Sequence, residues 1–192
     1  DDGKVDLITV AYEWGVSIAY GRGDGGFEPE ATLLATMDPD GAVAIETGDF
    51  DGDGAIDLAI GAANGGIEVW LRNADDDFDF STLLETSSYV RFTAGDFDGN
   101  RATDIALVDG DDNITIAYSN DGEFTPVAIS NEPFAIDLAP IDADGRAGLD
   151  LVYSRVRFDF NDGVRIFHDV CVILTYASPA NDSASFFGPD CR

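Results

Sequence analysis

The sequence predicts an all-β fold, a β-propeller of four four-stranded antiparallel blades, and two observations carry this prediction. The first is a repeated motif of aspartate and glycine: Gly48–Leu58 (GDFDGDGAIDL) returns as Gly95–Ile105 (GDFDGNRATDI) and, in shorter form, as Asp142–Leu151. The leading aspartates are 47 and 46 residues apart, a period that indicates repeated small structural units. The second observation is that no segment keeps a helical period of 3.6 residues over three turns.

Each repeat contains four short segments with the pattern of a strand. In the third repeat they are residues 89–94, 104–108, 114–118 and 125–129, separated by the acidic motif and by glycine-containing turns. The repeats span approximately residues 1–40, 41–87, 88–133 and 134–183. Four-stranded sheets repeated around an axis are propeller blades, so we expect residues 1–192 to form one domain. A linear β-solenoid is the alternative.

The two ends of the sequence read as the halves of one further motif. Asp190–Arg192 followed by Asp1–Leu7 is in register with Asp49–Leu58. We therefore expect residues 184–192 to be a closing strand that completes the first blade, either within one chain or in a neighbouring chain. This register favours a closed ring over a solenoid.

The acidic composition excludes several classes of partner. Lysine and arginine number 10 against 38 aspartates and glutamates, a formal net charge of −28. Nucleic acid and anionic lipid both need a basic surface, so we expect neither as a partner. No apolar run reaches the roughly 18 residues that a membrane span needs, which argues against membrane insertion. Clustered carboxylates repel one another unless a cation lies among them.

The first complete motif has the residues of a calcium loop. Asp49, Asp51, Asp53 and Asp57 stand at positions one, three, five and nine, and the carbonyl of Ala55 stands at position seven. Ca²⁺ takes 6–8 hard oxygen ligands, and this set supplies most of them. No His or Cys is near, which disfavours zinc and copper. We expect Ca²⁺ here, in a structural role.

The other motifs depart from this set by degrees. The second offers Asp96, Asp98, Asn100, the Ala102 carbonyl and Asp104, with one charge fewer and Arg101 in place of a glycine. We expect weaker calcium binding there. In the next motif, Arg146 stands among Asp142, Asp144 and Asp150 and is expected to replace the ion by a salt bridge. The composite motif across the ends offers Asp190, Asp2 and Asp6 but has Arg192 at position three, so the residues decide neither for nor against metal.

The motif resembles the FG-GAP or VCBS repeat family, which includes integrin-α head propellers and many secreted adhesins and lectins. The resemblance rests on Gly48–Leu58, on its copy at Gly95–Ile105, and on the turns Gly23–Phe27 and Asn120–Phe124. It implies propeller blades and calcium bound in the acidic loops. Family propellers commonly have about seven blades, and this chain has repeats for four.

The remaining features favour an extracellular binding protein. Cys171 and Cys191 are expected to form a disulfide, and Asn113 and Asn181 begin glycosylation tripeptides. No nucleophile elbow, phosphate loop or zinc signature appears, so we expect no enzyme. We expect a secreted recognition or adhesion module that binds protein or carbohydrate. A lectin proper and a self-assembling subunit of an extracellular fibre, joined by strand exchange, are the alternatives.

Overall fold

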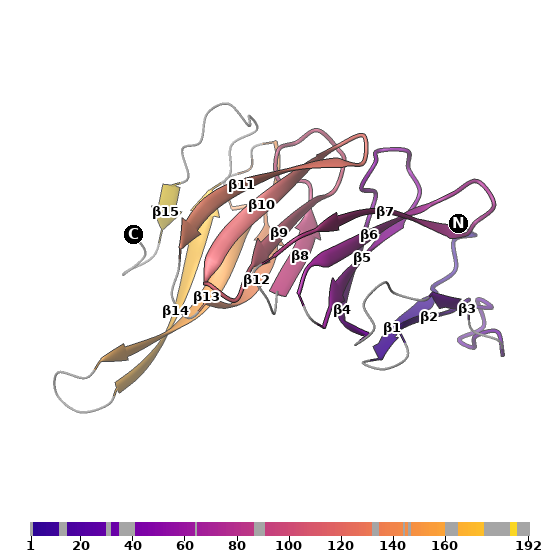
Figure 1. The fold of residues 1–192 in the computed structure, drawn as a ribbon, viewed down its shortest axis with the longest axis horizontal. Coiled ribbons are helices and arrows are strands. Elements are labelled where there is room, and N and C mark those ends of the chain that lie inside the picture. Colours follow the sequence, from indigo (N-terminus) through magenta and orange to yellow (C-terminus); the bar gives the residue numbers. More distant parts are fainter. Residues whose placement is uncertain are drawn as a thin grey trace.

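The fold is all-β: four small antiparallel sheets follow one another along the chain (Figure 1). The structure is a computed structural model that describes residues 2–11, 15–29, 32–34, 41–63, 65–86, 91–131, 135–143, 145, 147–159, 165–174 and 185–187. These residues contain no helix, and hence none that could span a membrane.

Each sheet is a meander of consecutive strands, so that neighbours in the sequence are neighbours in space. Sheet 1 contains β1 (Leu7–Ala11), β2 (Gly15–Ala19) and β3 (Thr32–Leu34). Sheet 2 contains β4 (Ala42–Gly48), β5 (Asp57–Ala62), β6 (Ile67–Arg72) and β7 (Phe78–Leu84). Sheet 3 contains β8 (Arg91–Gly95), β9 (Asp104–Val108), β10 (Asn113–Asn120) and β11 (Glu123–Asn131). Sheet 4 contains β12 (Ala135–Ile141), β13 (Asp150–Asp159), β14 (Arg165–Leu174) and β15 (Ser185–Phe187).

The hydrophobic core lies between the sheets, in three clusters. Val16 and Ile18 of sheet 1 pack against Leu58 and Ile60 of sheet 2. The other two clusters lie between sheets 2 and 3 and between sheets 3 and 4. Each of these two receives a fully buried phenylalanine that follows the first aspartate of a motif, Phe50 or Phe97. The acidic motif therefore also anchors its sheet to the next one.

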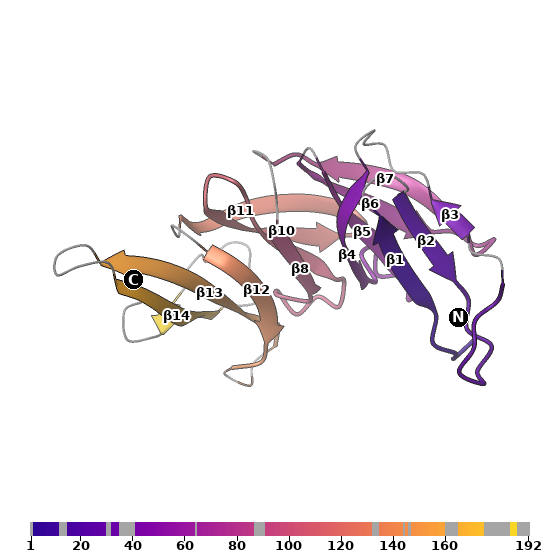
Figure 2. The same ribbon diagram turned by 90° about the horizontal axis from the view of Figure 1, so that it is seen from below.

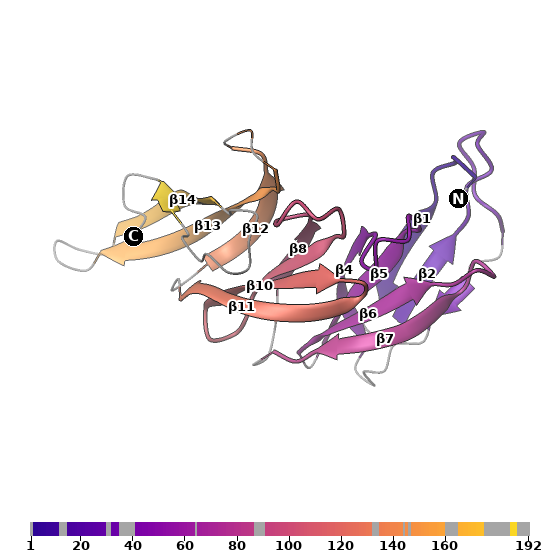
Figure 3. The same cartoon turned by 90° about the horizontal axis from the view of Figure 1, so that it is seen from above.

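The first strands of the sheets lie side by side along the inner side of the row. Strand β1 contacts β4, β4 contacts β8, and β8 contacts β12. Figures 2 and 3 show the sheets stacked in this order along an open arc, with sheet 1 and sheet 4 at its two ends. Sheets 2, 3 and 4 have the four strands predicted for a blade, whereas sheet 1 has three among the described residues. A radial succession of such antiparallel sheets is the arrangement expected of propeller blades.

The predicted closure is wrong. Ser185–Phe187 does not complete sheet 1; it pairs with β14 as the fourth strand of sheet 4, with Ile173 opposite Phe186. Among the described strands no hydrogen-bonded ladder joins sheet 1 to sheet 4. The physical reason is local: sheets 2 and 3 also take their last strand from the segment after their third strand, and pairing nearby segments closes a shorter loop. The ten-residue strands β13 and β14 lengthen the fourth repeat, which places its last strand where the sequence suggested a closing one.

Candidate metal centres

Three acidic loops join the first strand of a sheet to its second. Loop 2 (Asp49–Asp57) joins β4 to β5, loop 3 (Asp96–Asp104) joins β8 to β9, and loop 4 (Asp142–Asp150) joins β12 to β13. In each loop the position-one carboxylate accepts the position-four glycine N–H at 2.7 Å, the donors being Gly52, Gly99 and Gly145. These glycines have φ between 72° and 79°, a region that glycine enters without strain. The shared glycine explains why the three loops turn alike.

Further hydrogen bonds of the same kind shape loops 2 and 3. The position-three carboxylates, Asp51 and Asp98, accept the N–H two residues further on at 3.1 and 3.0 Å. The position-five side chains, Asp53 and Asn100, each accept the position-seven N–H at 2.7 Å. Such Asx turns are characteristic of Asp and Asn. They give both loops the same backbone despite their different residues.

The position-nine aspartate has a structural task in every sheet. Both oxygens of the buried Asp57 accept backbone N–H groups, from Phe50 and from Arg72 fifteen residues on, at 2.8 Å. Asp104 accepts in the same way from Phe97 (2.7 Å) and Ser119 (2.8 Å). Asp6 in sheet 1 accepts from Gly21, again fifteen residues on. In sheets 2 and 3 this aspartate therefore ties the loop to the third strand, and in sheet 1 it ties the segment before β1 to the residue Gly21 after β2.

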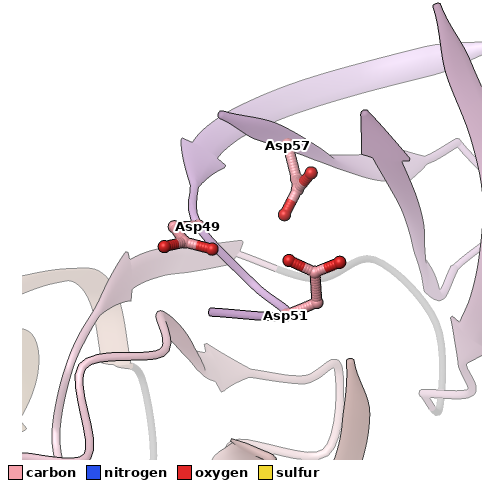
Figure 4. Close-up of side chains that lie close together, drawn as sticks. All are labelled: Asp49, Asp51 and Asp57. Atoms are coloured by element: carbon pink, nitrogen blue, oxygen red, sulfur yellow. The ribbon is translucent and has the colours of Figure 1, made fainter. Parts of the chain in front are cut away.

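Three of the predicted ligand side chains come together in loop 2 and three in loop 3. Asp49, Asp51 and Asp57 form one group and Asp96, Asp98 and Asp104 the other, each residue offering an oxygen within 4.8 Å of the other two. Figure 4 shows the carboxylates of the first group turned toward a common space. Oxygens that share one Ca²⁺ at 2.3–2.6 Å lie at most about 5 Å apart. Both groups therefore fit a calcium ion in spacing and in their all-oxygen chemistry.

The electrostatics of the groups favour a cation. Burial raises the pKa of Asp57, and it raises the pKa of Asp104 to about 7, although backbone N–H groups act in the opposite direction. Burial also raises the pKa of Asp51, helped by the charges of Asp53 and Asp49, and that of Asp98. Like charges and desolvation both disfavour ionised carboxylates. A bound cation or a proton relieves this repulsion.

Loops 2 and 3 differ in the residues at positions five and six. Asp53 lies outside the close group of loop 2. Asn100 donates its side-chain N–H to the carbonyl of Ser119 at 2.8 Å. Arg101 occupies position six with φ of 84°, where loop 2 has Gly54 at 92°. A side chain in this region is strained, as the replacement of glycine predicts.

The two weaker predicted centres are described in part. In loop 4, Asp150 accepts the N–H of Ala143 at 2.9 Å, which repeats the position-nine bond of loops 2 and 3, while Asp144 and Arg146 lie outside the described residues. At the composite motif, Asp2 forms an ion pair with Lys4 at 2.6 Å. Asp190 and Arg192 also lie outside the described residues.

The residues of the predicted disulfide and of the two glycosylation candidates lie only partly within the described residues. Cys171 is buried in the core between sheets 3 and 4 and is disulfide-bonded. Its expected partner Cys191, like the glycosylation candidate Asn181, lies outside the described residues. The side-chain nitrogen of Asn113 donates to both oxygens of Asp109 at 3.1 Å. A glycan on Asn113 would have to displace these hydrogen bonds.

Sequence reasoning missed the residues that join one loop to the next sheet. The carbonyl of Asp49 accepts the N–H of Thr103 at 2.7 Å, and the carbonyl of Asp96 accepts that of Leu149 at 2.7 Å. The Ser119 hydroxyl also donates to the carbonyl of Phe50. The available signal was a serine in β10, a strand whose other buried residues are the apolar Ile114, Ile116 and Ala117.

Comparison with known proteins assigns the family. No curated protein matches the chain. A family model described as an FG-GAP-like repeat matches residues 1–60 and again residues 49–107, more than half of the chain. The second match begins at the first aspartate of loop 2 and includes the whole of loop 3. The chain therefore belongs to the FG-GAP-like repeat family.

Proposed function

We propose that the chain is a calcium-stabilised, non-catalytic recognition module of the extracellular space, built of propeller blades, that binds a protein or a glycan. The observation that carries the calcium part is the repetition of one geometry: the same three loop positions bring three carboxylates together in loop 2 and again in loop 3. Both groups offer the oxygen ligands and the spacing that Ca²⁺ takes in proteins.

The calcium sites have a structural role in this proposal. Ca²⁺, when bound, supplies the positive charge that the clustered carboxylates need. Asp49 follows the end of β4 and Asp57 begins β5, so the ligands of one ion belong to both ends of the loop between two strands. Binding to the folded loop alone stabilises the folded chain. Since both oxygens of Asp57 and Asp104 accept backbone N–H groups, we assign these carboxylates to structure and not to catalysis.

A cleft between sheets 2 and 3 is the candidate ligand site. It has a volume of about 480 Å³ and is lined by apolar Leu84, Leu107 and Ala117 and by polar Glu85 and Thr115, among others. Strand β9 begins at loop 3 with Asp104 and ends at Val108 beside the cleft, so the cleft lies at the opposite strand ends from the acidic loops. Apolar walls with a few polar groups suit a peptide segment or a sugar ring. The net charge of −28 favours a neutral or basic ligand.

The fibre alternative has lost its expected mechanism. It required the segment 184–189 to complete the first sheet of a neighbouring chain. Ser185–Phe187 is instead paired with β14 of its own chain.

The extracellular assignment is supported by the disulfide at Cys171, since such bonds persist in oxidising compartments.

A binding survey tests the recognition part. Purified chain is applied to a glycan array and to a panel of purified extracellular proteins, in millimolar Ca²⁺ and in EDTA. We expect a ligand that is lost on Thr115→Trp, which fills the cleft, and kept on Ser81→Trp, which adds the same side chain to the exposed face of β7. A ligand that Thr115→Trp leaves bound would place recognition elsewhere.

A further inference from the structure

Ser119 lies where loop 3 meets loop 2, and it contacts both. It is almost completely buried, with 1% of its surface exposed, near the end of β10. Its N–H donates to Asp104 at 2.8 Å, and its carbonyl accepts the side-chain N–H of Asn100 at 2.8 Å. Its hydroxyl donates to the carbonyl of Phe50 in loop 2. One residue therefore holds two predicted ligands of loop 3 and the backbone of loop 2.

In loop 2, Phe50 connects Ser119 to a further predicted ligand, Asp57. The N–H of Phe50 donates to Asp57 at 2.8 Å. Residue Phe50 thus holds the position-nine ligand of loop 2 with its N–H, and its carbonyl accepts the Ser119 hydroxyl. Hydrogen bonds connect Asp57 to Phe50, Phe50 to Ser119, and Ser119 to Asp104 and Asn100, without a gap.

In sheets 1 and 2, the corresponding residues do not offer this link. Arg72 donates its N–H to Asp57 as Ser119 does to Asp104, but its side chain forms an ion pair with Asp76 of its own sheet at 3.3 Å. Gly21 donates to Asp6 and has no side chain. Among these three equivalent positions, the hydroxyl that reaches the preceding loop belongs to Ser119.

We infer that Ser119 is a positioning residue that couples the two cation sites, so that filling either one raises the affinity of the other. The inference rests on the proposed calcium binding at loops 2 and 3. An ion in loop 3 fixes Asp104 and Asn100 and through them Ser119, whose hydroxyl then holds Phe50 and Asp57 in the geometry that an ion in loop 2 needs. Coupling of this kind is reciprocal and typically changes affinity by about 5-fold or more.

A site-resolved calcium titration tests this inference. The amide resonances of Gly52 and Gly99 follow loops 2 and 3 separately by NMR. Asp51→Ala removes the first site and Asp98→Ala the second. We expect each substitution to weaken calcium binding at the remaining site by about 5-fold or more, by equal factors in the two directions.

The same titration with Ser119→Ala removes the hydroxyl. We expect the affinity of each site then to be independent of the other, while Thr93→Val, which removes another buried hydroxyl of sheet 3, keeps the coupling. If Ser119→Ala does not fold, Ser119→Cys tests the same link, because it keeps a side chain of similar shape and a thiol is only a weak hydrogen-bond donor. Coupling that survives the loss of the Ser119 hydroxyl in either variant overturns the inference. Two independent sites in the unsubstituted chain overturn it too but leave the calcium proposal intact, whereas no calcium binding at all overturns both.

Discussion

Loops 2 and 3 have one backbone and two different sets of side chains. Both place glycine at position four and bury the position-nine aspartate, and both bring three carboxylates together. Loop 3 replaces Asp53 by Asn100 and Gly54 by Arg101, which removes one negative charge and adds a positive one. The comparison teaches that the aspartates divide into two kinds: position nine is buried and ties the loop to another strand of its sheet, whereas positions one and three are less buried, accept N–H groups only within their own loop, and gain most from a bound cation.

The largest expected effect separates these two kinds of aspartate. Asp57→Ala and Asp104→Ala each leave two backbone N–H donors without their acceptors, so both should lower the free energy of unfolding by about 3 kcal/mol or more, even in EDTA. Asp51→Ala in EDTA should change it far less, because it removes a repelled, partly exposed carboxylate. Urea unfolding in EDTA measures both. Equal losses at positions three and nine would contradict the division.

The pH dependence of stability in EDTA should be of similar size. The folded pKa of Asp104 is about 7 and its ordinary value is 3.8, so between these values the folded state binds more protons than the unfolded state. Stability should therefore fall as pH rises from about 4 to 7, by about 1.4 kcal/mol for each unit of pKa difference. Asp104→Asn should flatten this slope, and saturating Ca²⁺ should suppress it. A slope unchanged in Asp104→Asn would assign the effect to other carboxylates.

The calcium-dependent part of stability should rank the two loops. Because loop 2 carries one more negative charge at position five, Asp51→Ala should remove more calcium-dependent stability than Asp98→Ala, with the difference on the order of 1 kcal/mol. Melting curves at several Ca²⁺ concentrations give both values. The reverse order would show that burial, which is greater around loop 3, outweighs ligand charge.

The smallest expected effect comes from position six. Arg101→Gly should relieve the strain of a positive φ and stabilise the chain by about 1 kcal/mol. Gly54→Ala should cost a similar amount in loop 2, where φ is 92°. Chemical denaturation of both variants completes the comparison. A destabilising Arg101→Gly would mean that the arginine makes contacts worth more than the strain.

The sequence predicted most of what lies within a repeat. The spacing of Asp49, Asp51 and Asp57 is enough to specify the loop, because Asx turns and the position-four glycine are local features that depend on a few neighbouring residues. The same holds for the four strands predicted in the third repeat, which correspond to β8, β9, β10 and β11 of sheet 3. Asp53 was predicted as a ligand but lies outside the close group, since spacing alone does not say which way a side chain turns.

Relations between repeats were harder to predict. The pairing of Ser185–Phe187 depends on where the long β13–β14 hairpin ends, and the register of the motif across the ends carries no information on that. The role of Ser119 depends on contacts between sheets, and a lone serine in a strand shows no pattern that points to a neighbouring loop. Local motifs determine the loops and strands within a repeat, whereas strand pairing at the chain ends and contacts between sheets depend on packing.

The most direct test of the account is the thermal stability of the unsubstituted chain with and without calcium. We predict a melting temperature clearly higher in millimolar Ca²⁺ than in EDTA, because each ion present at 100 times its dissociation constant adds about 2.7 kcal/mol. The same measurement in Mg²⁺ in place of Ca²⁺ controls for general screening of the acidic surface. Equal melting temperatures in Ca²⁺ and EDTA would contradict the claim that loops 2 and 3 are calcium sites that hold this fold together.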